Sequence, residues 1–114
     1  MDMLIPDQWK KDVCSVLHSG DQKRIIMRES ARLGWSAAFP SAWNYELFEA
    51  IERALSDAQI TGRQIMDMAE PGETYAFWFY HEGRKLFGKI CLTPSRDVII
   101  MYSAHPPRKG EEKL

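Results

Sequence analysis

Residues 74–105 read TYAFWFYHEGRKLFGKICLTPSRDVIIMYSAH, and this stretch decides the fold. Three runs rich in aromatic and β-branched residues are separated by two short breaks, HEGR at 81–84 and TPSR at 93–96. Glycine tolerates positive φ and proline holds φ near its turn value, so both breaks are typical of turns. The pattern predicts three antiparallel strands joined as a meander, at Thr74–Tyr80, Lys85–Leu92 and Asp97–Ala104.

Side chains alternate between the two faces of a strand, and regular turns fix the register of a meander. One predicted face is hydrophobic and forms the core: Tyr75, Phe77, Phe79, Leu86, Ile90, Leu92, Ile99 and Met101. The opposite face mixes aromatic side chains with two lysines: Ala76, Trp78, Tyr80, Lys85, Phe87, Lys89, Cys91, Val98, Ile100 and Tyr102. A sealed core does not tolerate unpaired lysines, so we expect this second face to be open.

The predicted register also brings charged residues to one end of the sheet. With Tyr80 opposite Lys85 and Leu92 opposite Asp97, Arg84 lies level with His105 on the next strand. His81 and Ser103 lie at the same end of the sheet. The two prolines after His105 end the strand and turn Arg108 back toward this corner. Strict alternation places His105 on the core side, so its ring would have to reach round the end of the sheet.

The N-terminal half predicts helices. Asp7 can cap a helix that ends at Gly20, and an apolar stripe predicts a second one over Tyr45–Ala58. Residues 21–34 fit either a helix or a short strand, and residues 34–44 are predicted as a loop. Thr61 and Gln64 form a capping-box pattern that predicts a short helix to about Ala69. Helices followed by a meander indicate an α+β fold, in which N-terminal helices pack on a C-terminal antiparallel β-meander, with residues 1–114 as a single domain.

Composition is ordinary for a globular protein, with 45% hydrophobic and 27% charged residues and a formal net charge of −1. The charge does not favour a generally basic nucleic-acid binder. Cys14 and Cys91 fit no metal or redox spacing, so they are either free thiols or one disulfide, and they favour a reducing compartment. We see no apolar run like a signal peptide or a membrane span. We therefore expect a cytoplasmic protein without membrane association.

The sequence contains no nucleotide-binding glycine loop, no zinc-protease motif and no serine-hydrolase motif. His105 is the best candidate for acid–base chemistry, because histidine exchanges a proton near neutral pH. The neighbouring Arg108 and Lys109 could hold a phosphate or stabilise negative charge. The alternative is a histidine that only closes the strand end through a hydrogen bond.

Aromatic residues with interleaved lysines form the second signal. Trp78, Tyr80, Phe87 and Tyr102 share a predicted face with Lys85 and Lys89. Bases of a single-stranded nucleic acid stack on aromatic rings while lysines bind phosphates. The alternative is that a helix or a protein partner covers this face.

YAFWFYHEGRKLFGKICL at 75–92 and VIIMYSAHPPRKG at 98–110, after a helix, form an arrangement that resembles the small toxin ribonucleases with barnase-, EndoU-, colicin- and RelE-like folds. The resemblance covers the chain from Tyr45 onward and lies in element order, since these families vary their catalytic residues. It implies metal-independent cleavage of RNA, in which a 2′-hydroxyl attacks the adjacent phosphate. It leaves the first forty residues unexplained.

Two functions follow from these patterns. The first is an endoribonuclease toxin of a bacterial toxin–antitoxin or related system, which needs no cofactor and has a cognate antitoxin or inhibitor protein as its partner. Its catalytic residues would be His105, Arg84, Arg108 and Tyr102, and its RNA-binding residues Lys85, Lys89, Trp78, Tyr80 and Lys109. The second is a non-catalytic binding protein that uses its aromatic face, such as an immunity protein, an antitoxin-like inhibitor or a phage-encoded inhibitor.

Overall fold

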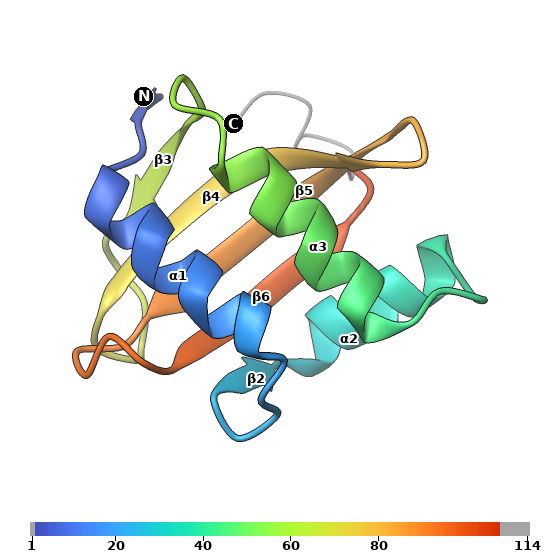
Figure 1. The fold of residues 1–114 in the computed structure, drawn as a ribbon, viewed down its shortest axis with the longest axis horizontal. Coiled ribbons are helices and arrows are strands. Elements are labelled where there is room, and N and C mark those ends of the chain that lie inside the picture. The colour runs from blue at the N-terminus through green and yellow to red at the C-terminus, as the bar shows by residue number, and fades with distance from the viewer. Residues whose placement is uncertain (1, 108–114) are drawn as a thin grey trace.

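The structure is a computed structural model that describes residues 2–107. These residues form three helices and one six-stranded sheet (Figure 1). The helices are α1 (Asp7–Ser19), α2 (Glu29–Ala38) and α3 (Asn44–Leu55). The strands are β1 (Met3–Leu4), β2 (Ile25–Met27), β3 (Thr61–Ile65), β4 (Glu73–His81), β5 (Arg84–Leu92) and β6 (Ile99–His105). The predicted α+β class is therefore confirmed.

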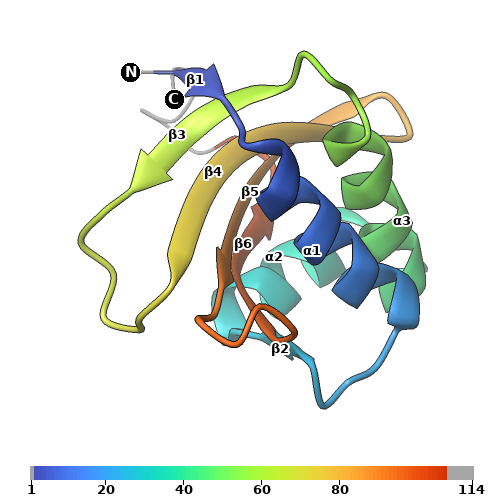
Figure 2. The same ribbon diagram turned by 60° about the vertical axis from the view of Figure 1, so that its left-hand side comes forward.

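The strands lie in the order β1-β3-β4-β5-β6-β2, and every pair is antiparallel except β6 and β2. Helices α1 and α3 lie over one face of the sheet, while α2 lies beside the β6 edge (Figures 1 and 2). We call the face under α1 and α3 the inner face and the opposite one the outer face. The predicted meander is thus the centre of a wider sheet.

The β4–β5 hairpin forms as its sequence predicts. Glu82 and Gly83 make a two-residue turn, and both have positive φ, at 49° and 76°. Such a turn matches the twist of the two strands and keeps their pairing regular from His81–Arg84 to Glu73–Leu92. The predicted pairing of Tyr80 with Lys85 is confirmed.

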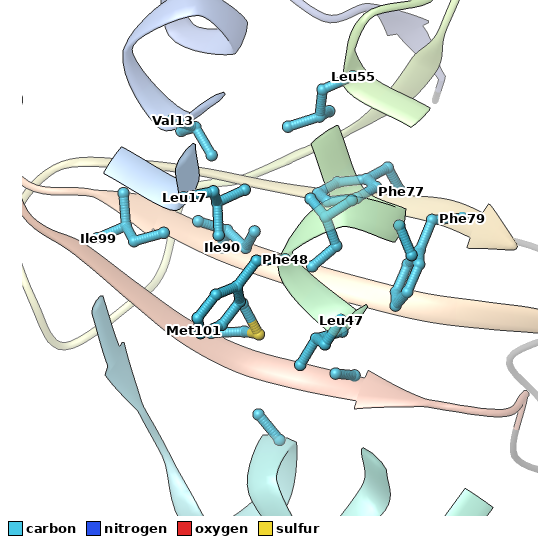
Figure 3. Packing of buried hydrophobic residues seen from close by; sticks show 14 of the residues in the cluster. Val13, Leu17, Leu47, Phe48, Leu55, Phe77, Phe79, Ile90, Ile99 and Met101 are labelled. Carbon is cyan, nitrogen blue, oxygen red and sulfur yellow. The ribbon is translucent and has the colours of Figure 1, made fainter. Parts of the chain in front are cut away.

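The core lies between the inner face and the helices α1 and α3 (Figure 3). All eight predicted core residues of the meander are buried: Tyr75, Phe77, Phe79, Leu86, Ile90, Leu92, Ile99 and Met101. Trp9, Val13, Val16 and Leu17 of α1 are buried at the predicted helical spacing. Helix α1 ends at Gly20 in the left-handed conformation, as predicted.

Two predictions for the chain before the meander were wrong. The predicted helix from Thr61 to Ala69 is instead the strand β3, which pairs with β4 on one side and β1 on the other. Its capping-box pattern is a local signal, and pairing on both edges outweighs it. Of the two alternatives for residues 21–34, the short strand is present as β2, and α2 begins after it. The predicted loop at residues 34–44 was wrong in its first half, because α2 continues to Ala38.

The predicted register of β6 was also wrong. Leu92 pairs with Ile99, two residues beyond the predicted partner Asp97. A β-bulge follows, because Ile90 pairs with Met101 while its neighbour Lys89 pairs with Ser103. The bulge inserts one extra residue and reverses the alternation beyond it. His105 therefore pairs with Phe87 and lies on the outer face, without reaching round the sheet.

A candidate nucleic-acid-binding face

Three adjacent strands arrange the outer face in rows. Trp78 of β4 pairs with Phe87 of β5, which pairs with His105 of β6. The rows on either side of this aromatic row contain lysines: Lys85 opposite Tyr80, and Lys89 opposite Ser103. The structure thus brings together most of the residues predicted to contact RNA.

The aromatic row is in continuous ring contact. The Trp78 and Phe87 centroids lie 5.5 Å apart in an edge-on arrangement, and those of Phe87 and His105 lie 5.6 Å apart. Tyr80, one same-face position beyond Trp78, is 58% exposed. Rings that support one another laterally offer a fixed surface on which a base can stack.

The two lysines are held by aromatic rings. The Nζ of Lys85 lies 4.3 Å from the Trp78 ring centroid, and the Nζ of Lys89 lies 5.8 Å from that of Tyr102. Within residues 2–107 neither lysine forms an ion pair with a carboxylate. Both charges can therefore attract an external anion, although a base that stacks on this face of Trp78 has to displace the Lys85 ammonium.

The far end of the outer face is closed by polar contacts. The Tyr102 hydroxyl donates to Oε1 of Glu70 at 2.6 Å, and the Arg28 guanidinium donates to the same oxygen at 2.7 Å. These hydrogen bonds, first from Tyr102 and then from Arg28, lower the pKa of Glu70. Burial and the bond to Glu70 raise the pKa of Tyr102, so its hydroxyl stays protonated at neutral pH. Tyr102 therefore cannot serve as a base while this network is intact.

His105 is 3% exposed and lies where β6 ends. Its Nδ1 is 2.8 Å from the carbonyl oxygen of Pro106, which can only accept a hydrogen bond. In the tautomer with its proton on Nδ1, the ring donates a hydrogen bond to this oxygen. Helix α2 supports this geometry, because Gly34 comes so close that an added Cβ would lie 2.7 Å from Cβ of His105.

Arg84 does not join His105, contrary to the prediction. It is three residues from Phe87 on β5, so its side chain leaves the strand on the inner side. There Nη1 donates to the carbonyl oxygen of Ala38 at 3.0 Å, and Cζ lies 5.4 Å from the Phe39 ring centroid. The error follows from the shifted register and the bulge of β6. The predicted residues Arg108 and Lys109 lie outside the described residues.

Sequence reasoning missed Arg63, which the predicted helix removed from the sheet. In β3 it pairs with Ala76 and so extends the row that contains Lys89 and Ser103. Reading TGRQI as an alternating strand would have found it. The sequence offered no signal for Arg28 and Glu70, because a contact between residues 42 positions apart depends on the tertiary fold.

No family model matches the chain, and no curated protein or solved structure shows significant similarity to it. Across residues 2–107 there is no group of three or more His, Cys, Asp or Glu side chains that could hold a metal ion. Over the same residues, no helix has the length and apolar character needed to cross a membrane. Cys14 and Cys91 are free thiols.

Proposed function

We propose that the protein is an endoribonuclease that binds single-stranded RNA on its outer face. The observation that supports this most is the pairing of the aromatic row, Trp78–Phe87–His105, with lysines in both adjacent rows and no carboxylate bound to them among residues 2–107. Stacking of bases and neutralisation of phosphates are the two requirements for binding a single strand.

The proposed chemistry is cleavage by internal transesterification. His105 accepts the proton of a ribose 2′-hydroxyl, and the 2′-oxygen bonds to the adjacent phosphorus. The bond from phosphorus to the 5′-oxygen of the next nucleotide breaks, and that oxygen takes a proton from solvent. The products are a 2′,3′-cyclic phosphate and a 5′-hydroxyl. Lys85 and Lys89 stabilise the negative charge that develops on the phosphate.

The test uses a labelled single-stranded RNA and the same oligonucleotide with 2′-deoxyribose throughout. We expect the RNA alone to be cut, with a cyclic phosphate at the new 3′ end. His105→Ala should lower the cleavage rate by at least about a hundredfold, the usual contribution of a positioned acid or base. The control is His18→Ala, because His18 is exposed on α1, and α1 lies over the inner face of the sheet (Figure 1).

Two results would count against the proposal. Cleavage of the deoxyribose strand would exclude attack by a 2′-hydroxyl. A His105→Ala variant that melts like the wild type and cuts RNA equally fast would remove His105 from the mechanism. As part of the same proposal, the protein acts in the cytoplasm and is held in check by a cognate inhibitor protein.

A second candidate function is that of an inhibitor that binds another protein through the outer face. The exposure of Tyr80 favours it, since tyrosine and tryptophan dominate the energetics of protein interfaces. If the protein neither binds nor cuts single-stranded RNA, the inhibitor function is favoured over the endoribonuclease function.

A further inference from the structure

Arg63 and Lys89 lie in one row of the outer face, separated by one small residue. Arg63 pairs with Ala76, and Ala76 pairs with Lys89, so the three residues form one row across β3, β4 and β5. Adjacent strands lie about 4.8 Å apart, which places the backbones of Arg63 and Lys89 roughly 10 Å from each other. Both side chains leave the sheet on its outer side. The Lys89 ammonium lies near the Tyr102 ring of β6, so Lys89 has to turn across Ala76 to share an anion with Arg63.

The hydrogen-bonding capacity of Arg63 is incompletely used. Its Nε is buried and has no acceptor. In the part of the chain that the structure describes, neither Arg63 nor Lys89 forms an ion pair. Glu70, which lies at the end of the same face, already binds Arg28 and Tyr102. A buried donor without an acceptor destabilises the protein. The two Nη atoms of Arg63 are not among the buried atoms and form no hydrogen bond within residues 2–107, so they are the donors that an anion can reach.

We infer that Arg63 and Lys89 together hold one phosphate of a polynucleotide backbone above Ala76. A guanidinium donates two parallel hydrogen bonds to phosphate oxygens, and an ammonium adds a point charge from the other side. The aromatic row lies one same-face position away along the strands, roughly 6.6 Å. A nucleotide with its phosphate at Arg63 and Lys89 therefore places its base at Trp78. The inference rests on the proposed function and adds a residue that no motif indicates.

The experiment measures binding of a fluorescent single-stranded oligonucleotide made of 2′-deoxyribose, which cannot be cut, at several salt concentrations. The variants are R63Q, K89Q and the double variant, with R53Q as the control because Arg53 is exposed on helix α3. We expect each single variant to lose about tenfold in affinity, as for a hydrogen bond to a charged group. The R63K variant, which keeps the charge but loses the two parallel donors, should recover only part of the loss.

Salt dependence distinguishes one phosphate bound by both residues from two phosphates bound by one residue each. Each phosphate that a protein neutralises on a single strand releases counterions and contributes about 0.7 to the slope of log affinity against log salt. If both side chains bind one phosphate, the double variant should lose at most about 0.7 from the wild-type slope, whereas two phosphates would give a loss of about 1.4. The double variant should also lose less affinity than the product of the two single losses.

The outcomes separate this inference from the proposed function. A wild-type protein that binds no oligonucleotide overturns both. Normal wild-type binding with an R63Q variant that melts and binds like R53Q overturns the phosphate site alone. Losses that multiply, with slopes that add, would show that Arg63 and Lys89 bind different phosphates and would also overturn it.

Discussion

Gly34 is the residue at which helix α2 comes closest to strand β6. A Cβ added there would lie 2.7 Å from Cβ of His105 and 3.2 Å from the Ala104 carbonyl oxygen. Both of these atoms belong to or adjoin the backbone of a paired strand, so they cannot move without disturbing the sheet. Glycine inside a helix is normally unfavourable, and here close packing of α2 on β6 requires it.

We predict that Gly34→Ala destabilises the protein. Overpacking costs about 1–3 kcal/mol, which exceeds the roughly 0.5–1 kcal/mol that alanine gains over glycine within a helix. Urea unfolding measures the change, and Ser36→Ala, at an exposed position of the same helix, is the control. A Gly34→Ala variant that is more stable than the wild type would show that α2 can shift away from β6. If the variant folds, displacement of His105 should also lower RNA cleavage.

Ile90 tests how rigidly the core is packed. It is fully buried on the inner face of β5, among the residues that α1 and α3 cover. Ile90→Ala should lower the free energy of unfolding by about 2–5 kcal/mol, because the lost contacts and the new cavity add together. Leu33→Ala, at an exposed position of α2, should change it by less than about 0.5 kcal/mol. A loss below 1 kcal/mol at Ile90 would mean that the core closes around the gap.

At the scale of elements, Arg96 joins three parts of the chain. It lies in the turn between β5 and β6 with φ of 64°, and its Nε donates to Asp12 of α1 at 2.7 Å. Its Nη1 donates to Glu73 of β4 at 2.6 Å. The hydrogen bond from Arg96, followed by that from Gln8, lowers the pKa of the Asp12 carboxyl below its ordinary value of 3.8.

This contact predicts a loss of stability in acid. A carboxyl whose pKa is lower in the folded state stabilises that state above the ordinary pKa, and the contribution disappears as the pH falls through the lower folded value. Stability from Asp12 should therefore be complete above about pH 4 and decline below it. Arg96→Gln should make thermal melting less dependent on pH in this range, whereas Arg53→Gln should not. Glu70 keeps its own low pKa in the variant, so part of the pH dependence remains. An unchanged profile in Arg96→Gln would show that Asp12 is not coupled to folding through this arginine.

The sequence predicted an element correctly where neighbouring residues determine it, and failed where pairing with a distant strand determines it. The hairpin at Glu82 and Gly83 follows from local turn chemistry, and its register and faces were correct. The β5–β6 connection is longer and contains a residue in the left-handed conformation at Arg96, so no rule fixed its register. The strand β3 was mistaken for a helix because its pairing partners, β1 and β4, are distant from its own capping pattern.

The same difference between local and distant pairing decided which residues of the candidate site were predicted correctly. Lys85, Lys89, Trp78 and Tyr80 lie on or next to the hairpin, and the sequence placed them on one face correctly. Arg84 and His105 depended on β6, where a shift of two residues and one bulge separated their side chains. Arg63 depended on β3 and was missed. A site built from paired strands is thus predictable only as far as each register is.

At the scale of the whole molecule, the protein has no excess of positive charge, but several cations lie together on the outer face. The formal net charge is −1, so the protein as a whole does not attract a polyanion. Arg63, Lys85 and Lys89 nevertheless share the outer face, and no ion pair involves them within residues 2–107. The proposed binding of a nucleic acid therefore relies on this face, where the cations and the aromatic rings lie together.

This distribution predicts a preference for single strands. A duplex presents phosphates but keeps its bases stacked, so it can use the cations of the outer face and not the rings. We expect a single-stranded oligonucleotide of 2′-deoxyribose to bind at least about tenfold tighter than the matching duplex, since one stacked base contributes about 1–3 kcal/mol. Tyr80→Ala should weaken the single strand by a similar amount and leave the duplex unchanged, because Tyr80 is exposed and bears no charge. Fluorescence anisotropy measures both affinities, and Tyr45→Ala, at an exposed tyrosine on α3, is the matched control. Equal affinity for both forms, with no effect of Tyr80→Ala, would mean that the face acts through charge alone and that its rings serve another partner.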